Sequence, residues 1–264
     1  MILRKTIESI FVLLFSKVPV LRLINGNTLK LPLPICRFYK DGEEVKFHKI
    51  LELWSCAVSA DVGAHIGLTT FIMSQECKKV VAFEPSPKNV KFLKQTVRMN
   101  VLDNVEIYPK AVSGASIPRK FALREGRANN GNSLTDLSGV NELIAVEATS
   151  LDELGIAFDF IKIDAEGAEL EILQGGRTTI GKSRRLILSL HCDILYKNKL
   201  DPKKVFYELE NLGGVMIDQF GEVLESDYAG KNLPGILELY VLFPKNEPEW
   251  EQLLCSAQGI LKAK

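Results

Sequence analysis

The sequence predicts an α/β fold in which helices cover both faces of a doubly wound, mostly parallel sheet. Between residues 57 and 243, short apolar runs alternate with segments of helical spacing, as is typical of parallel strands joined by crossover helices. The first apolar run leads into a glycine-bearing turn, and four of the runs end in an acid or a histidine. Ligands of such sheets bind at the carboxyl ends of the strands, so these polar residues are the first candidates for a functional site.

Residues 1–50 are expected to form an extension ahead of a main domain at residues 51–264. Residues 1–24 contain the apolar run Ile10–Phe15, which is too short to span a bilayer, and they lack a small-residue cleavage site. Neither a transmembrane helix nor a signal peptide is therefore expected. We predict an amphipathic N-terminal helix that packs on the domain, mediates a homodimer or contacts a membrane surface peripherally.

Residues 25–50 contain two turn signals, Asn25-Gly26 and Asp41-Gly42. Such dipeptides favour tight turns between strands, and Pro32 and Pro34 suit only an edge strand. We therefore predict a small β cap, built of short strands or a hairpin, before the main sheet.

The first half of the main domain has the pattern of three strands and two crossover helices. Pro87 suits the first turn of a helix, and Val90, Leu93 and Val97 recur after it at helical spacing. The runs on either side of this helix are short and apolar, as buried strands are. In order, we predict a strand at Ala57–Asp61, a helix at Leu68–Cys77, a strand at Val80–Glu84, a helix at Pro87–Asn100 and a strand at Val105–Tyr108.

The second half continues the alternation after a polar, glycine-bearing stretch, Arg124–Ser138, which we predict to be a loop or lid. Two later helices end at Gly175-Gly176 and Gly213-Gly214. The last two strands are predicted to form an antiparallel pair. The expected elements are a helix start at Ser150–Leu154, strands at Phe158–Ile163 and Leu186–Leu190, helices at Ala165–Gly176 and Asp201–Leu212, strands at Val215–Phe220 and Leu237–Phe243, and a helical tail at Glu247–Lys264.

The charge and the cysteine content narrow the class of protein. Lys and Arg number 33, and Asp and Glu also number 33, so no overall field favours nucleic acid as a partner. The five cysteines show no C-x-x-C spacing, so we expect neither a structural zinc site nor a disulfide framework, and a reducing, cytoplasmic location fits best. The cysteines are Cys36, Cys56, Cys77, Cys192 and Cys255.

Four motifs together resemble one family. They are DVGAHIG at residues 61–67, FEPSP at 83–87, SLDEL at 150–154 and IKIDAEGAELEILQGG at 161–176. Over roughly residues 57 to 243, the chain resembles the FkbM family of S-adenosylmethionine-dependent methyltransferases. The resemblance implies a class I, Rossmann-like sheet of seven strands with a final antiparallel hairpin, and S-adenosyl-L-methionine as the cofactor.

The cofactor is expected at the ends of the first two strands. Glu84 closes the second strand, where a carboxylate can accept hydrogen bonds from two ribose hydroxyls. The resemblance places Asp61 against the amino acid part of the cofactor, and Ser86 follows Glu84 on the adenine side. The complete set of predicted cofactor-binding residues is Asp61, Gly63, Ala64, His65, Gly67, Glu84 and Ser86.

The turn after the first strand favours a cofactor without phosphate. Its spacing, D-x-G-x-x-x-G, is not the G-x-G-x-x-G that lets a backbone approach a pyrophosphate. A cationic sulfonium tolerates Asp61, Glu84 and Asp164 nearby. His65 departs from the asparagine that the family usually has at this place, so the contact made there is expected to differ in detail.

The methyl acceptor and the catalytic groups are expected at the next two strand ends. Asp164 and Glu166 follow the fourth strand and His191 follows the fifth, and these three are the predicted catalytic residues. An alcohol must lose its proton as it receives a methyl group, and a carboxylate or an imidazole, that of His65 included, can take the proton. Glu169 is expected to be structural, and a metal ion is not expected to be required.

These residues together predict O-methylation of a hydroxyl on a sugar, a glycolipid or a secondary metabolite. The polar run Asn129–Ser133, expected over the mouth of the site, suits such a hydroxyl-rich small-molecule or glycan acceptor. Two alternatives stay open. One is a non-catalytic cofactor-binding or scaffolding protein on the same fold, and the other is a nicotinamide-dependent oxidoreductase, which the missing G-x-G-x-x-G disfavours.

Overall fold

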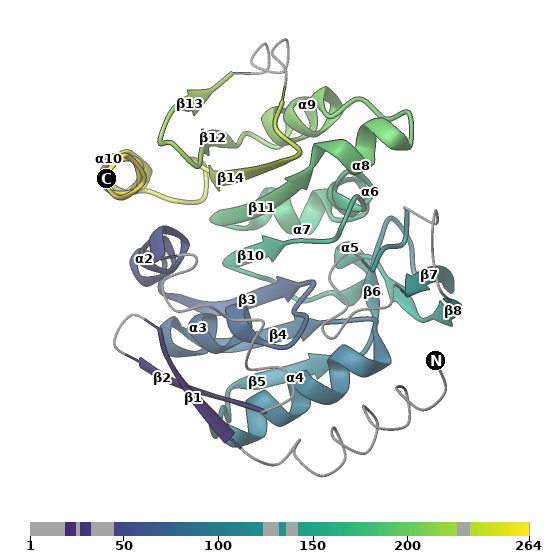
Figure 1. Cartoon of the computed structure of the whole chain (residues 1–264). Helices are drawn as coiled ribbons and strands as arrows, with labels where there is room; N and C mark the ends of the chain where they lie inside the picture. The colour runs from purple at the N-terminus through teal and green to yellow at the C-terminus, as the bar shows by residue number, and fades with distance from the viewer. Residues whose placement is uncertain are drawn as a thin grey trace.

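The computed structural model describes residues 19–24, 27–32, 45–123, 132–135, 142–225 and 233–263. The strands of its central sheet are β3 (Cys56–Val62), β4 (Cys77–Phe83), β5 (Val105–Tyr108), β10 (Phe160–Ile163), β11 (Arg185–His191), β12 (Val215–Asp218), β13 (Val223–Leu224) and β14 (Ile236–Leu242). They lie in the order β13-β12-β14-β11-β10-β3-β4-β5 (Figure 1). The α/β architecture expected from the sequence is confirmed.

The strands are parallel except towards one edge of the sheet. β3 pairs in parallel with β10 and β4, β10 pairs in parallel with β11, and β4 with β5. β14 runs antiparallel between β11 and β12, as predicted for the last two strands. The expected count of seven is one strand too few, because a turn after β12 adds the short antiparallel strand β13. Asp218 Oδ1 stabilises this turn by accepting the N–H groups of Phe220 and Glu222, both at 2.9 Å.

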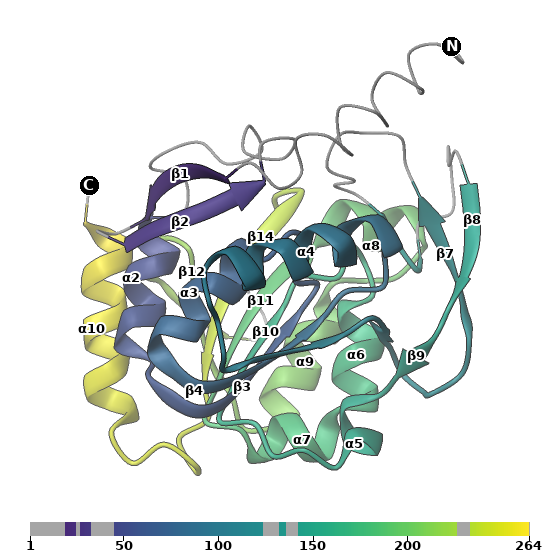
Figure 2. The same cartoon turned by 90° about the horizontal axis from the view of Figure 1, so that it is seen from below.

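Helices cover both faces of the sheet (Figures 1 and 2). One layer consists of α2 (Val45–Leu53), α3 (Leu68–Glu76), α4 (Pro87–Met99) and α10 (Trp250–Lys262). The other consists of α5 (Leu151–Leu154), α6 (Glu169–Gly175), α7 (Arg177–Lys182), α8 (Cys192–Lys197) and α9 (Lys203–Asn211). Successive residues of a strand face opposite layers. On β10, Phe160 packs in the layer that contains α3 and α4, and Ile161 packs in the layer that contains α6 and α9. In the described residues, no helix is long and apolar enough to cross a membrane.

Most of the predicted elements of the main domain are confirmed to within four residues of their predicted ends. The start of α4 shows the local cause, because Ser86 Oγ accepts the N–H of Asn89 at 3.5 Å and Pro87 occupies the first turn. The sequence patterns did not predict the helices α2, α7 and α8 or two small sheets. These sheets pair β6 (Ala111–Val112) with β9 (Ala148–Thr149), and β7 (Arg119–Leu123) with β8 (Glu142–Val146).

The described part of the N-terminal extension is a β-hairpin. β1 (Pro19–Ile24) pairs antiparallel with β2 (Asn27–Pro32), and only Asn25 and Gly26 separate them in the sequence. The predicted β cap is confirmed as a hairpin, but its predicted range, residues 25–50, is wrong at both ends, because the first strand lies at residues 19–24 and residues 45–50 belong to α2. The predicted helix is wrong over residues 19–24, whereas residues 1–18 lie outside the described part of the chain, as do Asp41 and Gly42.

The hairpin is a strand pair because the main domain offers β2 a partner. The side-chain amide of Asn100, at the end of α4, accepts the N–H of Lys30 and donates to its carbonyl oxygen, both at 2.8 Å. Leu29 and Leu31 are fully buried in the layer that contains α3 and α4. A helix over residues 19–24 could not form the antiparallel pairs with β2. Because the main domain holds β2 in place, tertiary contacts decide the local structure of this segment.

A disulfide joins Cys56 and Cys77 at the beginning of β3 and β4, which corrects the expectation that these cysteines are reduced. The parallel register places the two residues opposite each other, with Cα atoms 4.5 Å apart, within the range that a disulfide requires. Their separation of 21 residues in the sequence carries no sign of this proximity. Cys192 and Cys255 are free.

Candidate functional site

A turn after β3 forms the centre of the site, at the carboxyl ends of the strands. Gly63 begins the turn with a φ of 79°, and a Cβ atom there would lie 1.9 Å from the carbonyl oxygen of Asp164. Only glycine therefore lets this turn pack against the residue that follows β10. Gly67 ends the turn with a φ of 93° and begins α3. The two predicted halves of the site, one after β3 and one after β10, are thus in contact.

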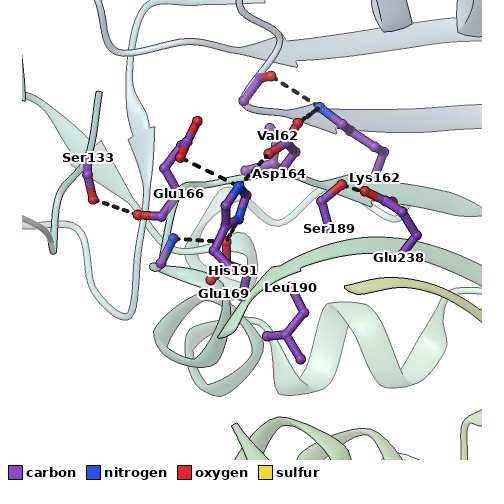
Figure 3. A network of polar contacts seen from close by, with 12 residues as sticks. Val62, Ser133, Lys162, Asp164, Glu166, Glu169, Ser189, Leu190, His191 and Glu238 are labelled. Carbon is purple, nitrogen blue, oxygen red and sulfur yellow. Dashed lines mark hydrogen bonds and ion pairs between the residues drawn. The ribbon is translucent and has the colours of Figure 1, made fainter. Parts of the chain in front are cut away.

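Asp61 is buried beneath this turn and is held by the protein itself. The hydroxyl of Thr70 donates to Asp61 Oδ2 at 2.6 Å, and the ammonium group of Lys162 lies 3.3 Å from Asp61 Oδ1. The same ammonium group donates to the carbonyl oxygen of Gly63 at 3.1 Å. It also pairs with Asp164 Oδ2 at 3.6 Å (Figure 3). Lys162 therefore ties the end of β3, the glycine turn and the end of β10 together.

Glu84 connects the ends of β3 and β4. Its Oε2 accepts the backbone N–H of His65 at 2.9 Å, and its Oε1 accepts the N–H of Ser86 at 2.8 Å and the side-chain amide of Asn89 at 3.4 Å. Burial raises the pKa of Glu84 to about 7, although these three hydrogen bonds and the charge of Lys162 oppose the rise. The carboxyl group can therefore change its charge near neutral pH.

His65 lies in the turn and has an unusual backbone conformation and a buried ring nitrogen. Its φ of 52° is unusual for a residue other than glycine, and its buried Nε2 has no hydrogen-bond partner among the described residues. Burial lowers the pKa of His65 to about 4, against the opposing charge of Asp164. The imidazole is therefore neutral at physiological pH and can donate or accept one further hydrogen bond. Ala64 beside it is buried and donates its N–H to the carbonyl oxygen of Phe83 at 3.0 Å.

His191 lies among three carboxyl groups at the ends of β10 and β11 (Figure 3). Its Nδ1 is 2.8 Å from Oε1 of Glu169, and its Nε2 is 3.5 Å from Oε2 of Glu166 and 3.8 Å from Oδ1 of Asp164. Burial alone would lower the pKa of His191, but the hydrogen bond to Glu169 and the three negative charges raise it to about 9. His191 is therefore a cation at neutral pH. Within the described ranges, no cluster of His, Cys, Asp and Glu has the arrangement of a metal site.

A short segment from the predicted loop contacts this cluster. The hydroxyl of Ser133 donates to the carbonyl oxygen of Glu166 at 2.6 Å, and that of Thr135 does so at 3.4 Å. Glu166 and Asp164 keep side-chain exposures of 28% and 40%, so a ligand can reach both. The described part of the loop thus borders the site, whereas Asn129 and Asn130 lie outside the described residues.

The structure brings the predicted catalytic residues, Asp164, Glu166 and His191, into one cluster. The predicted cofactor-binding residues surround the ends of β3 and β4, and Asp164 adjoins both groups. Ser86 serves as the N-terminal cap of α4, and Asp61 is enclosed by protein, so both also have structural roles that the sequence reading did not assign.

Two further residues of the site were missed. Lys162 is a buried charge in the otherwise apolar strand β10, and this isolated lysine was the available signal. Glu169 was expected to be structural, but its buried carboxylate holds the imidazole of His191. No spacing in the sequence predicts that contact, because it depends on how α6 packs against the end of β11.

A comparison with protein families finds a match over more than half of the chain. A family model described as "Methyltransferase FkbM domain" matches residues 61–225. The structure is similar to methyltransferase FkbM of Methylobacillus flagellatus KT, with 17% identity and a TM-score of 0.47, over 70% of this chain and 43% of that chain. The chain thus spans less than half the length of that protein.

Two smaller relatives match over more of their length. TYW2 of M. jannaschii, in complex with AdoMet, shows 15% identity and a TM-score of 0.41 over 84% of each chain. SMU.1697c of Streptococcus mutans, in complex with SAH, shows 12% identity and a TM-score of 0.45 over 77% of this chain and 99% of that chain. A search of curated proteins found no match.

Proposed function

Since the chain belongs to the FkbM methyltransferase family, we propose that it transfers the methyl group of S-adenosyl-L-methionine to a hydroxyl group of a small-molecule or glycan acceptor. The observation that carries this proposal is the extent of the family match, which at residues 61–225 includes the glycine turn, Glu84 and the His191 cluster. A sugar, a glycolipid or a hydroxylated secondary metabolite is the class of acceptor that such polar surroundings suit.

Three features support a cofactor of this chemistry at the ends of β3 and β4. Glu84 accepts three hydrogen bonds from the protein, and a carboxylate has lone pairs for about four, so acceptor capacity is left for a ribose hydroxyl. Within the part of the chain that the structure describes, the buried Nε2 of His65 has no hydrogen-bond partner, as expected of a polar atom that a ligand satisfies. The carboxyl groups of Asp164 and Glu166 favour a cation nearby. When bound, the cofactor supplies an electrophilic methyl group.

The cluster around His191 supports an acceptor that carries a hydroxyl. As the acceptor oxygen bonds to the methyl carbon and the carbon–sulfur bond breaks, the hydroxyl proton must pass to a base. The partly exposed carboxylates of Asp164 and Glu166 are the bases that this arrangement offers, because His191 already carries its proton at neutral pH. Holding the acceptor oxygen in line with the methyl group supplies much of the remaining rate.

Calorimetric titration with S-adenosylmethionine and S-adenosylhomocysteine tests the proposal. We expect binding with one site per chain. Glu84→Gln should weaken it about tenfold or more, since a hydrogen bond to a charged group contributes roughly 1.5–3 kcal/mol. The matched control is Glu106→Gln, which changes a surface carboxylate that pairs with Lys79 at 2.8 Å on the neighbouring strand. Absence of both heat and thermal shift at millimolar ligand would refute the proposal.

Turnover is tested separately, with methyl-labelled S-adenosylmethionine and a panel of sugars, glycolipids and hydroxylated metabolites. Label in an acid-stable ether product supports O-methylation. Label found only in amine products would support methyl transfer but would contradict a hydroxyl acceptor. Tight cofactor binding without any transfer of label would favour a non-catalytic protein.

A further inference from the structure

We propose that Glu169 is a positioning residue, which keeps His191 protonated and fixed so that the imidazolium holds the carboxylates of Asp164 and Glu166 turned towards the methyl acceptor. This inference rests on the proposed function and extends it to a residue that does not itself reach a ligand. It assigns His191 the role of a fixed cation instead of a general base.

One oxygen of the Glu169 carboxylate is held by two hydrogen bonds. Glu169 begins α6 and has no exposed surface. Its Oε1 accepts both Nδ1–H of His191 at 2.8 Å and the backbone N–H of Gly167 at 2.9 Å. Gly167 has a φ of 97°, and a Cβ atom there would lie 2.4 Å from the side chain of Ile194. The backbone that aims this N–H at Glu169 is therefore closely constrained.

The orientation of the imidazole follows from these contacts. Because Glu169 accepts a hydrogen bond from Nδ1, the other ring nitrogen, Nε2, faces the partly exposed carboxyl groups of Glu166 and Asp164 at 3.5 and 3.8 Å. Two negative charges at this distance favour a proton on Nε2 as well. The ring thus carries hydrogen on both nitrogens and bridges a buried acid to two acids that a ligand can reach.

The groups that face His191 come from every element packed around it. Asp164 and Glu166 lie between β10 and α6, Glu169 is the first residue of α6, and the ammonium group of Lys162 on β10 lies 3.6 Å from Asp164. On β14, the residue opposite His191 is the apolar Ile236, and Glu238 is hydrogen-bonded to Ser189 at 3.0 Å. Burial and the nearby charge of Glu169 raise the pKa of the Cys192 thiol to about 12, so that it stays neutral. Carboxylates therefore dominate the charge around the ring.

A protonated His191 serves the proposed reaction in two ways. Its positive charge opposes the mutual repulsion of the carboxylates of Asp164 and Glu166, which are the groups proposed to accept the acceptor's proton. Its Nε2–H also limits the positions that these partly exposed side chains can adopt. Without Glu169, burial would favour a neutral ring, and the two acids would lose their common cationic partner.

Glu169→Gln tests the proposal, with Glu171→Gln as the matched control. Glu171 lies on the same helix but pairs with Arg119 at 3.0 Å, outside the cluster. The readouts are the ¹⁵N and ¹³C resonances of His191 against pH, the affinity for S-adenosylhomocysteine, and the pH profile of kcat/KM. Glu169→Asp, which keeps the charge, guards against a folding defect in the glutamine variant.

The expected results are specific to the charge of Glu169. Wild-type His191 should be an imidazolium at pH 7 and titrate near pH 9, with kcat/KM falling above that pH. In Glu169→Gln, both the titration and the alkaline fall should move to lower pH by one unit or more, with little change in cofactor affinity. Glu171→Gln should behave as wild type, and Glu169→Asp should lie between wild type and Glu169→Gln.

Other outcomes overturn the inference without overturning the methyltransferase. A neutral His191 at pH 7 in the wild-type protein would do so even if every variant failed to fold. So would an unchanged profile in Glu169→Gln, or an equal shift in both glutamine variants. Failure of the wild-type protein to bind S-adenosylhomocysteine would instead strike the proposed function itself.

Discussion

Replacing Lys162 by methionine should destabilise the protein and loosen the glycine turn. The ammonium group lies 3.1 Å from the carbonyl oxygen of Gly63, 3.3 Å from Asp61 and 3.6 Å from Asp164. Methionine has a similar length but no charge, so the substitution removes these interactions while keeping most of the apolar packing. The variant keeps the buried carboxylate of Asp61. Of the side-chain contacts described above, this carboxylate then retains the hydrogen bond from Thr70.

The size of the effect follows from the burial of the pair. The side chains of Lys162 and Asp61 are 5% and 0% exposed, and removal of one partner of a buried pair costs about 3–5 kcal/mol. Asp61→Asn should cost a similar amount. The double variant should cost at least about 2 kcal/mol less than the sum of the two single changes, because it leaves no uncompensated charge. Lys79→Met, at an exposed pair with Glu106, should cost less than about 1 kcal/mol.

Urea unfolding, followed by circular dichroism and by fluorescence of the buried Trp54, gives the free energies of unfolding of the wild type and of these four variants. Cofactor affinity of the Lys162→Met variant, measured by calorimetry, should fall about tenfold or more, equivalent to about 1.4 kcal/mol, because the turn is no longer tied to β10. Lys162 does not hold the site together if Lys162→Met lowers the free energy of unfolding as little as Lys79→Met does. The same conclusion follows if the loss in the double variant equals the sum of the losses in the two single variants.

Three further predictions follow from the titrating groups and the disulfide. The pKa of His191 is about 9 in the folded protein, against 6.5 for an ordinary histidine. Protonation of His191 therefore stabilises the folded state by about 3 kcal/mol. This stabilisation is fully present below pH 6.5 and is lost as the pH rises through 9. Comparison of unfolding free energies for wild type and His191→Gln at pH 6 and 9.5 measures it, and a pH-independent difference would contradict it. The pKa of Glu84 is about 7, and a ribose hydroxyl donates more favourably to the ionised carboxylate. The affinity for S-adenosylhomocysteine should therefore fall below pH 7, by up to about tenfold per pH unit. The Glu84→Gln variant should show no such pH dependence. Reduction of Cys56–Cys77 should cost about 3 kcal/mol for a loop of this length, which thermal unfolding with and without reductant detects. An unchanged Tm would argue against the bond.

The sequence predicted the part of the fold in which local pattern and tertiary structure agree. From β3 to β5, apolar strands alternate with helices, and Ser86 and Pro87 mark the start of α4 by their own chemistry. The acidic strand ends were visible for the same reason, since Asp61, Glu84 and Asp164 each follow a buried apolar run. The glycine turn was also predictable, although its closest neighbour proved to be Asp164 rather than empty space for a ligand.

What the sequence did not predict depends on register and packing between distant segments. The pairing of Cys56 with Cys77 requires the parallel register of β3 and β4. The strand β1 exists because β2 is held against α4 by Asn100. Lys162 and Glu169 became site residues through partners on other elements, Asp61 and His191. Neither hydrophobic period nor motif spacing contains that information.

The most direct test of the account is a crystal structure with S-adenosylhomocysteine. We predict density at the carboxyl ends of β3 and β4, with a ribose hydroxyl on the carboxylate of Glu84, a contact to Nε2 of His65, and the sulfur facing Asp164 and Glu166. Density for the ligand at another place in the fold, or a bound ligand that leaves Glu84 without a hydroxyl partner, would contradict it.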